Sequence, residues 1–126
     1  MYKYIEKIKN DYIIKLIKPH LKGKKAYIIG GFVRDIFMNK ISYDRDLIIA
    51  EDNIKLFAKN LANKINAYFI ELDSDNNIYR IVLEDKINYI DITKPVENNF
   101  EKDIKRRDLT INSIAYDINN EKFIDL

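Results

Sequence analysis

Two adjacent glycines constrain the fold of this chain more than any other local feature. The chain contains only three glycines, and Gly30 and Gly31 directly follow the wholly apolar run 26–29. A short apolar run that stops at a glycine pair is typical of a buried β-strand followed by a tight turn. Residues 32–38 then have the pattern of a helix. The sequence therefore predicts a strand, a turn and a helix in direct succession.

The spacing of apolar residues predicts the other elements. Helical spacing predicts helices over 2–17, 54–65 and 100–106, the first of them ending near Pro19. Apolar runs bounded by turn residues predict strands over 46–50, 68–72, 78–83 and 88–92, with a last short strand pair on either side of Asn119-Asn120. Elements in this order predict an α/β (α+β) domain, in which one mixed sheet carries helices packed on one side.

Length and composition bound the class of protein. The chain has 126 residues, of which 47% are hydrophobic and 33% charged, so we expect one globular domain with a real core. The absence of cysteine excludes disulfides and thiolate metal sites. No apolar run approaches the roughly 20 residues of a membrane span. The first ten residues have no signal-peptide core, so we expect a cytoplasmic protein without a membrane partner.

The charge of the chain leaves nucleic-acid binding open. A net charge of +2 is too small to indicate it alone. Basic residues nevertheless gather in two clusters, which are Lys22, Lys24 and Lys25, and Lys102, Lys105, Arg106 and Arg107. Such clusters are commonly solvated surface, but they can also face phosphates.

The glycine turn has two interpretations. Glycine lets the backbone approach a ligand closely, and a helix that begins there offers free N–H groups and a positive dipole end to a phosphate. Arg34 lies one turn into the predicted helix, where it can donate two hydrogen bonds to the same anion. The alternative is an ordinary turn beside a surface arginine.

A pair of carboxylates opens the next predicted strand. Asp44 and Asp46 are two residues apart, so in a strand they project from one face while Arg45 points to the other. Neighbouring carboxylates repel each other unless a cation lies between them, and hard oxygen ligands select Mg²⁺. The pair is therefore either a Mg²⁺ site or simply a polar start to a strand.

A third polar block lies near the end of the chain, over residues 106–113. Its sequence is Arg-Arg-Asp-Leu-Thr-Ile-Asn-Ser, and its polar groups are set among apolar neighbours. Asp108 or Asn112 could cap a helix end. Alternatively, an arginine of this block meets a phosphate beside a carboxylate that supports a metal site.

Taken together, the three blocks resemble one family. Residues 30–35, 44–47 and 106–115 have the order and spacing found in the bacterial class II tRNA nucleotidyltransferases (CCA-adding enzymes) and poly(A) polymerases, which belong to the DNA polymerase β superfamily. The resemblance covers roughly residues 26–126. It implies a DNA polymerase β-like nucleotidyltransferase fold, in which residues 1–126 form the catalytic head domain without the neck, body and tail domains of the family.

The resemblance implies roles for the carboxylates. Asp44 and Asp46 would hold Mg²⁺, and Asp108 matches a third catalytic carboxylate used by the bacterial poly(A) polymerases. Asp91 is a further candidate, because strand parity could turn it toward the metal. The family does not uniformly require an acid at that position.

The resemblance also implies nucleotide contacts, by Gly30, Gly31, Arg34 and Arg107. The expected reaction is attack of an RNA 3′-hydroxyl on the α-phosphate of CTP or ATP, with loss of pyrophosphate. The expected RNA is tRNA, extended by CCA, CC or A.

The sequence departs from the family in two places. The neck of the family chooses between CTP and ATP with a Glu-Asp-x-x-Arg motif, but Glu84-Asp85 is followed by Lys86-Ile87-Asn88 in a predicted turn. The segment between Arg80 and Ile90 is shorter than in many CCA-adding relatives, which slightly favours a CC-adding or other partial specificity.

Three alternatives stay open from the sequence. The chain could be a head domain that binds nucleotide or RNA without catalysis, a catalytic head that needs a separate neck-and-body protein, or a poly(A) polymerase. The complete set of carboxylates and arginines favours an enzyme over a binding module.

Overall fold

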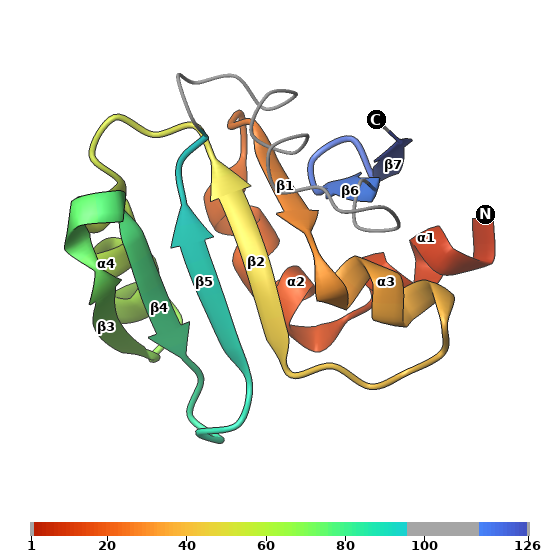
Figure 1. The fold of residues 1–126 in the computed structure, drawn as a ribbon, viewed down its shortest axis with the longest axis horizontal. Helices are drawn as coiled ribbons and strands as arrows, with labels where there is room; N and C mark the ends of the chain where they lie inside the picture. The colour runs from red at the N-terminus through yellow and green to blue at the C-terminus, as the bar shows by residue number, and fades with distance from the viewer. Residues whose placement is uncertain (1, 96–113, 126) are drawn as a thin grey trace.

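The computed structural model describes residues 2–95 and 114–125, and within them seven strands form one mixed sheet (Figure 1). Its strand order is β3-β4-β5-β2-β1-β6-β7. The strands are β1 (Ala26–Ile29), β2 (Asp44–Ile49), β3 (Tyr68–Asp73), β4 (Ile78–Val82), β5 (Tyr89–Thr93), β6 (Ile114–Asp117) and β7 (Lys122–Asp125). β2 and β5 pair in parallel, and the other neighbouring pairs are antiparallel. The expected mixed sheet is confirmed.

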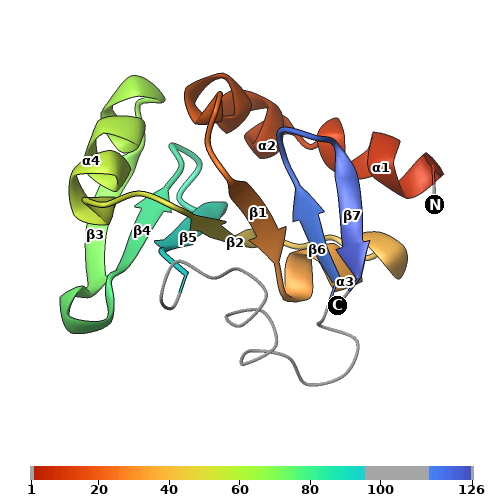
Figure 2. The same ribbon diagram turned by 90° about the horizontal axis from the view of Figure 1, so that it is seen from above.

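The helices pack on one side of this sheet. They are α1 (Tyr2–Lys9), α2 (Tyr12–Ile17), α3 (Gly31–Phe37) and α4 (Ile54–Lys64), with the short 3-10 helix η1 (Lys18–Leu21). A second 3-10 helix, η2 (Ser74–Asn76), connects β3 to β4 and has no buried residue. Figure 2 shows α1, α2 and α4 along the same side of the sheet. None of the helices in the described parts of the chain is long and apolar enough to cross a membrane. The helix expected over 100–106 lies outside the described residues.

The single helix expected over 2–17 is wrong, because the chain breaks between α1 and α2 at Asp11. Asp11 has φ −57° and ψ 130°, which leaves the helical region. Its Oδ2 accepts a hydrogen bond from the backbone N–H of Ile14 at 3.1 Å and so caps α2. The apolar spacing continues across the break, which is why periodicity alone predicts one helix.

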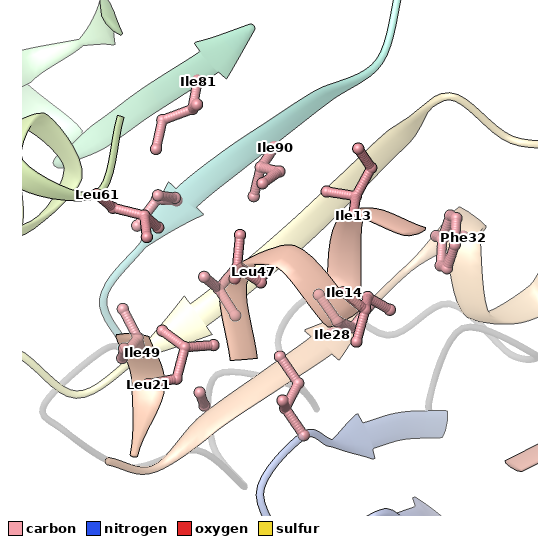
Figure 3. Close-up of a cluster of buried hydrophobic side chains, with 14 of the residues drawn as sticks. Ile13, Ile14, Leu21, Ile28, Phe32, Leu47, Ile49, Leu61, Ile81 and Ile90 are labelled. Atoms are coloured by element: carbon pink, nitrogen blue, oxygen red, sulfur yellow. The ribbon is translucent and has the colours of Figure 1, made fainter. Parts of the chain in front are cut away.

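The main core lies between the helices and one face of the sheet (Figure 3). Strand alternation turns Ile28, Leu47 and Ile90 toward the helices, and each of them is completely buried. Phe32 of α3 and Leu61 of α4 pack against this layer. Burial of one such side chain stabilises the fold by about 1.5–3 kcal/mol.

The opposite face of the sheet, hereafter the second face, carries a different set of side chains. Ile29, Ile48 and Ala115 form a small buried cluster there, with Tyr27 partly buried beside it. The same alternation places Asp44 and Asp46 of β2, Arg80 of β4 and Asp91 of β5 on this face. The candidate active site is built on it.

Candidate active site

The backbone of the β1–α3 turn packs against two of the predicted site side chains, Asp46 and Arg34. Gly30 has φ 77° and ψ −147°, and a β-carbon built on it would lie 3.1 Å from Oδ2 of Asp46. Gly31 begins α3, and a β-carbon there would lie 3.1 Å from Nη2 of Arg34. Both predicted glycines are therefore packed against predicted site residues, and larger side chains would displace these groups.

The two predicted carboxylates of β2 share the second face. Asp46 pairs in register with Ile29, the last residue of β1, so it lies directly beside the glycine turn. Asp44 is exposed, and Ser42 Oγ donates a hydrogen bond to its Oδ1 at 3.1 Å. Two carboxylates on one face offer the hard oxygen ligands that Mg²⁺ prefers. This donor set fits the expected metal.

Arg45, between these carboxylates, points to the helix side and is only 4% exposed. Its Nη2 and Nε donate hydrogen bonds to Oδ1 and Oδ2 of Asp11 at 2.9 and 3.0 Å. Its Nη1 donates to Oδ1 of Asn88 at 3.0 Å, and the guanidinium lies 4.5 Å from the ring centre of Phe32. Arg45 therefore ties the start of β2 to the break between α1 and α2.

Asp91 lies on the second face, as strand parity predicts, in register with Asp46 on the parallel strand. Arg80 of β4 donates hydrogen bonds from Nε and Nη2 to its two carboxylate oxygens at 2.7 and 3.0 Å. The bonding to Asp91 raises the pKa of Arg80. No group of three or more acidic, histidine or cysteine side chains within the described residues could hold a metal ion.

Arg80 and Tyr89 were not predicted as site residues. The guanidinium of Arg80 lies 4.0 Å from the ring centre of Tyr89, which is in register with Asp44. Burial, followed by the charge of Asp44, raises the pKa of the Tyr89 phenol, so the ring stays neutral at physiological pH. The alternation of Arg80 with buried Tyr79 and Ile81 was the sequence signal that could have found it.

Arg34 lies at the turn, as expected, and is partly exposed. Its Nε donates a hydrogen bond to Oδ1 of Asp35 at 3.2 Å, which leaves its other N–H groups available for a further acceptor. Arg107 and Asp108 lie outside the described residues. The convergence of Arg34 and Arg107 on one pocket beside Gly31 therefore stays a prediction.

Comparison with known proteins identifies the family. A family profile described as the poly A polymerase head domain matches residues 26–126. The chain belongs to this family. The head domain therefore has the nucleotidyltransferase fold that its motifs imply, and the three sequence blocks lie within the matched region.

Curated relatives of the head domain are longer enzymes. It is 32% identical over 122 residues to a CCA-adding enzyme of Bacillus cytotoxicus, covering 90% of this chain and 30% of the relative. It is 31% identical over 103 residues to a CC-adding tRNA nucleotidyltransferase of Synechocystis, covering 80% of this chain and 24% of the relative. The head domain thus spans less than a third of the length of these relatives.

Solved structures have the same fold. The head domain superposes on a Thermotoga maritima CCA-adding enzyme complexed with tRNA, with a TM-score of 0.79 and 26% identity, over 99% of this chain and 32% of the other. A CCA-adding enzyme with CTP gives a TM-score of 0.78 at 26% identity, over 98% of this chain and 32% of the other.

Proposed function

We propose that this head domain catalyses template-independent transfer of CMP, AMP or both from CTP and ATP to the 3′ end of a tRNA. The observation that carries the proposal is the close packing of the Gly30 turn beside the carboxylate pair, since a β-carbon on Gly30 would lie 3.1 Å from Oδ2 of Asp46. The names of the relatives, which add CC or CCA, support the substrate class. Structures of similar enzymes with CTP, or with primer tRNA and an ATP analogue, support both substrates.

The triphosphate would bind at the β1–α3 turn. Gly30 and Gly31 let phosphate oxygens approach the backbone, and Arg34 carries guanidinium N–H groups to the same place. We expect Arg107 to join it there. These contacts hold phosphates rather than bases, so they bind CTP and ATP alike.

The reaction is phosphoryl transfer. The 3′-hydroxyl of the RNA loses its proton to water, and its oxygen forms a bond to the α-phosphorus. The bond from that phosphorus to the bridging oxygen of the β-phosphate breaks, and pyrophosphate leaves. Asp44 and Asp46 would hold Mg²⁺, which supplies a lower pKa for the attacking hydroxyl and neutralises phosphate charge. The arginines stabilise negative charge that develops on the phosphates. We expect Asp108 to assist as a further carboxylate.

The test is incorporation of radiolabelled CTP and ATP into tRNA transcripts that end before the CCA sequence, after its first C and after CC. Addition of C only, of A only, or of both in sequence separates CC addition, A addition and CCA addition. A long run of A on any RNA would instead identify a poly(A) polymerase. No incorporation of any nucleotide, with or without an added neck-and-body fragment of a relative, together with Mg²⁺-dependent CTP binding, would identify a binding module.

A second candidate function is a head that needs a neck and body to extend RNA. Its support is the length relationship, since the head domain covers only 30% of the Bacillus cytotoxicus enzyme. The isolated chain should bind CTP in the micromolar-to-millimolar range, about 4–8 kcal/mol. It should extend tRNA slowly and with little preference among nucleotides, because precise positioning can contribute roughly 7–11 kcal/mol to a barrier. Assays with and without an added neck-and-body fragment of a relative test this.

A further inference from the structure

Two rows of paired residues cross the second face, from the carboxylates to the outer strand β3. The first row consists of Asp46, Asp91, Arg80 and Ile70. The second row consists of Asp44, Tyr89, Val82 and Tyr68. Neighbouring strands lie about 4.8 Å apart, so Arg80 is about 10 Å across the sheet from Asp46.

The geometry of the reaction assigns these rows to the RNA. In phosphoryl transfer the attacking and leaving oxygens lie roughly in line on opposite sides of the phosphorus. The glycine turn lies on the β1 side of Asp46, so the leaving pyrophosphate would point toward β1. The attacking 3′-hydroxyl then approaches from the β5 side. The end of the RNA would therefore lie over β5, β4 and β3.

On this side of the carboxylates, the planar guanidinium of Arg80 is held in place by two neighbouring residues, and one of them balances its charge. Asp91 accepts two hydrogen bonds from its guanidinium, and the ring of Tyr89 supports it by stacking. The Arg80 side chain is still 29% exposed, compared with 16% for Asp91. A guanidinium already neutralised by a carboxylate is a weak phosphate anchor, but its plane is well suited to stacking on a base.

The surface beyond this pair continues as apolar groups. Tyr68 and Ile70 on β3 are 52% and 43% exposed, and both belong to the rows that begin at the carboxylates. Single-stranded nucleic acids bind such faces through base stacking, which needs no particular base. This chemistry suits an RNA whose terminal base changes as nucleotides are added.

We infer, on the basis of the proposed transfer reaction, that Arg80 and Tyr89 form a stacking platform for the 3′-terminal base of the RNA. Asp91 is the positioning residue that holds the Arg80 guanidinium flat. The platform and the glycine turn thus lie on opposite sides of Asp44 and Asp46, with RNA on one side and triphosphate on the other.

The experiment compares the unchanged chain with Tyr89→Leu and Arg80→Lys, which keeps the charge beside Asp91 but removes the plane. Tyr12→Leu is the matched control, because Tyr12 is 66% exposed on α2, on the helix side of the sheet. Each protein is titrated with a tRNA transcript ending in CC, and with the same transcript lacking its 3′-terminal base. CTP affinity is measured in parallel, and thermal unfolding confirms that each variant is folded.

The unchanged chain should bind the abasic transcript about 10-fold more weakly than the intact one. Tyr89→Leu and Arg80→Lys should each bind the intact transcript about 10-fold more weakly, and removal of the base should then cost little more. Tyr12→Leu should behave like the unchanged chain, and CTP affinity should not change in any variant. In steady state, the KM for RNA should rise in the two platform variants while the KM for CTP stays the same.

Equal binding of intact and abasic transcripts by the unchanged chain would overturn the platform without reference to any variant. A loss of CTP affinity in place of RNA affinity would place this row on the triphosphate side and would also overturn it. A third outcome separates the two proposals. If no nucleotide is incorporated into any RNA, but removal of the terminal base still weakens binding to the unchanged chain and not to Tyr89→Leu, the proposed transfer function fails while the platform stands.

Discussion

Gly30 lies so close to Asp46 that a β-carbon on the glycine would stand 3.1 Å from Oδ2 of that carboxylate. The backbone of Gly30, with φ 77° and ψ −147°, lies in a region that only glycine readily adopts. The turn therefore needs glycine for two separate reasons, one conformational and one steric. The second reason links the turn directly to the candidate metal site.

We expect Gly30→Ala to reduce stability and to abolish nucleotide transfer. Gly23→Ala is the matched control, because Gly23 also has φ 77° but a β-carbon at that position would meet no atom within 4 Å. Each change should lower the free energy of unfolding by about 1–2 kcal/mol or more through backbone strain. Only Gly30→Ala should lose Mg²⁺-dependent CTP binding, measured by calorimetry. Equal loss of binding in both variants would refute a local role for the turn.

Asp44→Asn and Asp46→Asn should each reduce transfer by at least about 100-fold, because each change would remove a charged ligand of the proposed Mg²⁺. Both should leave the fold intact, since the change relieves repulsion between two carboxylates on one face. Asp75→Asn, at an exposed position in η2, is the control. Initial rates of CTP incorporation over a Mg²⁺ titration measure the effect. Normal rates in the two β2 variants would exclude these carboxylates from the reaction.

Arg34→Ala should weaken CTP and ATP to the same extent, by about 10- to 100-fold, because a hydrogen bond to a charged group contributes about 1.5–3 kcal/mol. Arg34→Lys should be intermediate, since it keeps the charge but loses the planar donor pair. Competition binding with the two nucleotides measures both values. The same parallel loss is expected for Arg107→Ala. A variant that loses only one of the two nucleotides would contradict a phosphate contact.

Arg45 and Asp11 should matter for stability rather than for nucleotide binding. Arg45→Met or Asp11→Asn leaves one charge of a largely buried pair without its partner, which should lower the free energy of unfolding by about 3–5 kcal/mol. Asparagine can still cap α2, so Asp11→Asn tests the ion pair rather than the cap. Urea unfolding provides the measurement.

The comparison for this ion pair is Glu121→Gln, which breaks the more exposed pair between Lys18 and Glu121. Exposed pairs contribute at most about 1 kcal/mol, so this change should have a small effect. If all three variants lose the same small amount, the Arg45–Asp11 pair does not anchor β2. The double variant of Arg45 and Asp11 should lose less than the sum of the single changes, because the two residues share one interaction.

The sequence alone determined the local parts of the site. The i, i+2 spacing of Asp44 and Asp46 set their common face, and the glycine pair marked the turn after β1, because side-chain direction in a strand and tolerance of positive φ are local properties. The same parity placed Asp91 on the second face. The order of the motifs was enough to indicate the family.

Which of these parts meet depends on how the strands and helices pair in the folded chain. The pairing of β2 with β5 places Asp91 beside Asp46, and the pairing of β4 with β5 places Arg80 beside Asp91. Asp11 caps α2 and accepts hydrogen bonds from Arg45, which lies on a strand 34 residues further along the chain. The chain therefore forms two helices where the apolar periodicity predicted one. Strand partners and ion pairs of this kind depend on the closure of long loops around a shared core. A periodic pattern reports only the direction of each side chain relative to its own element.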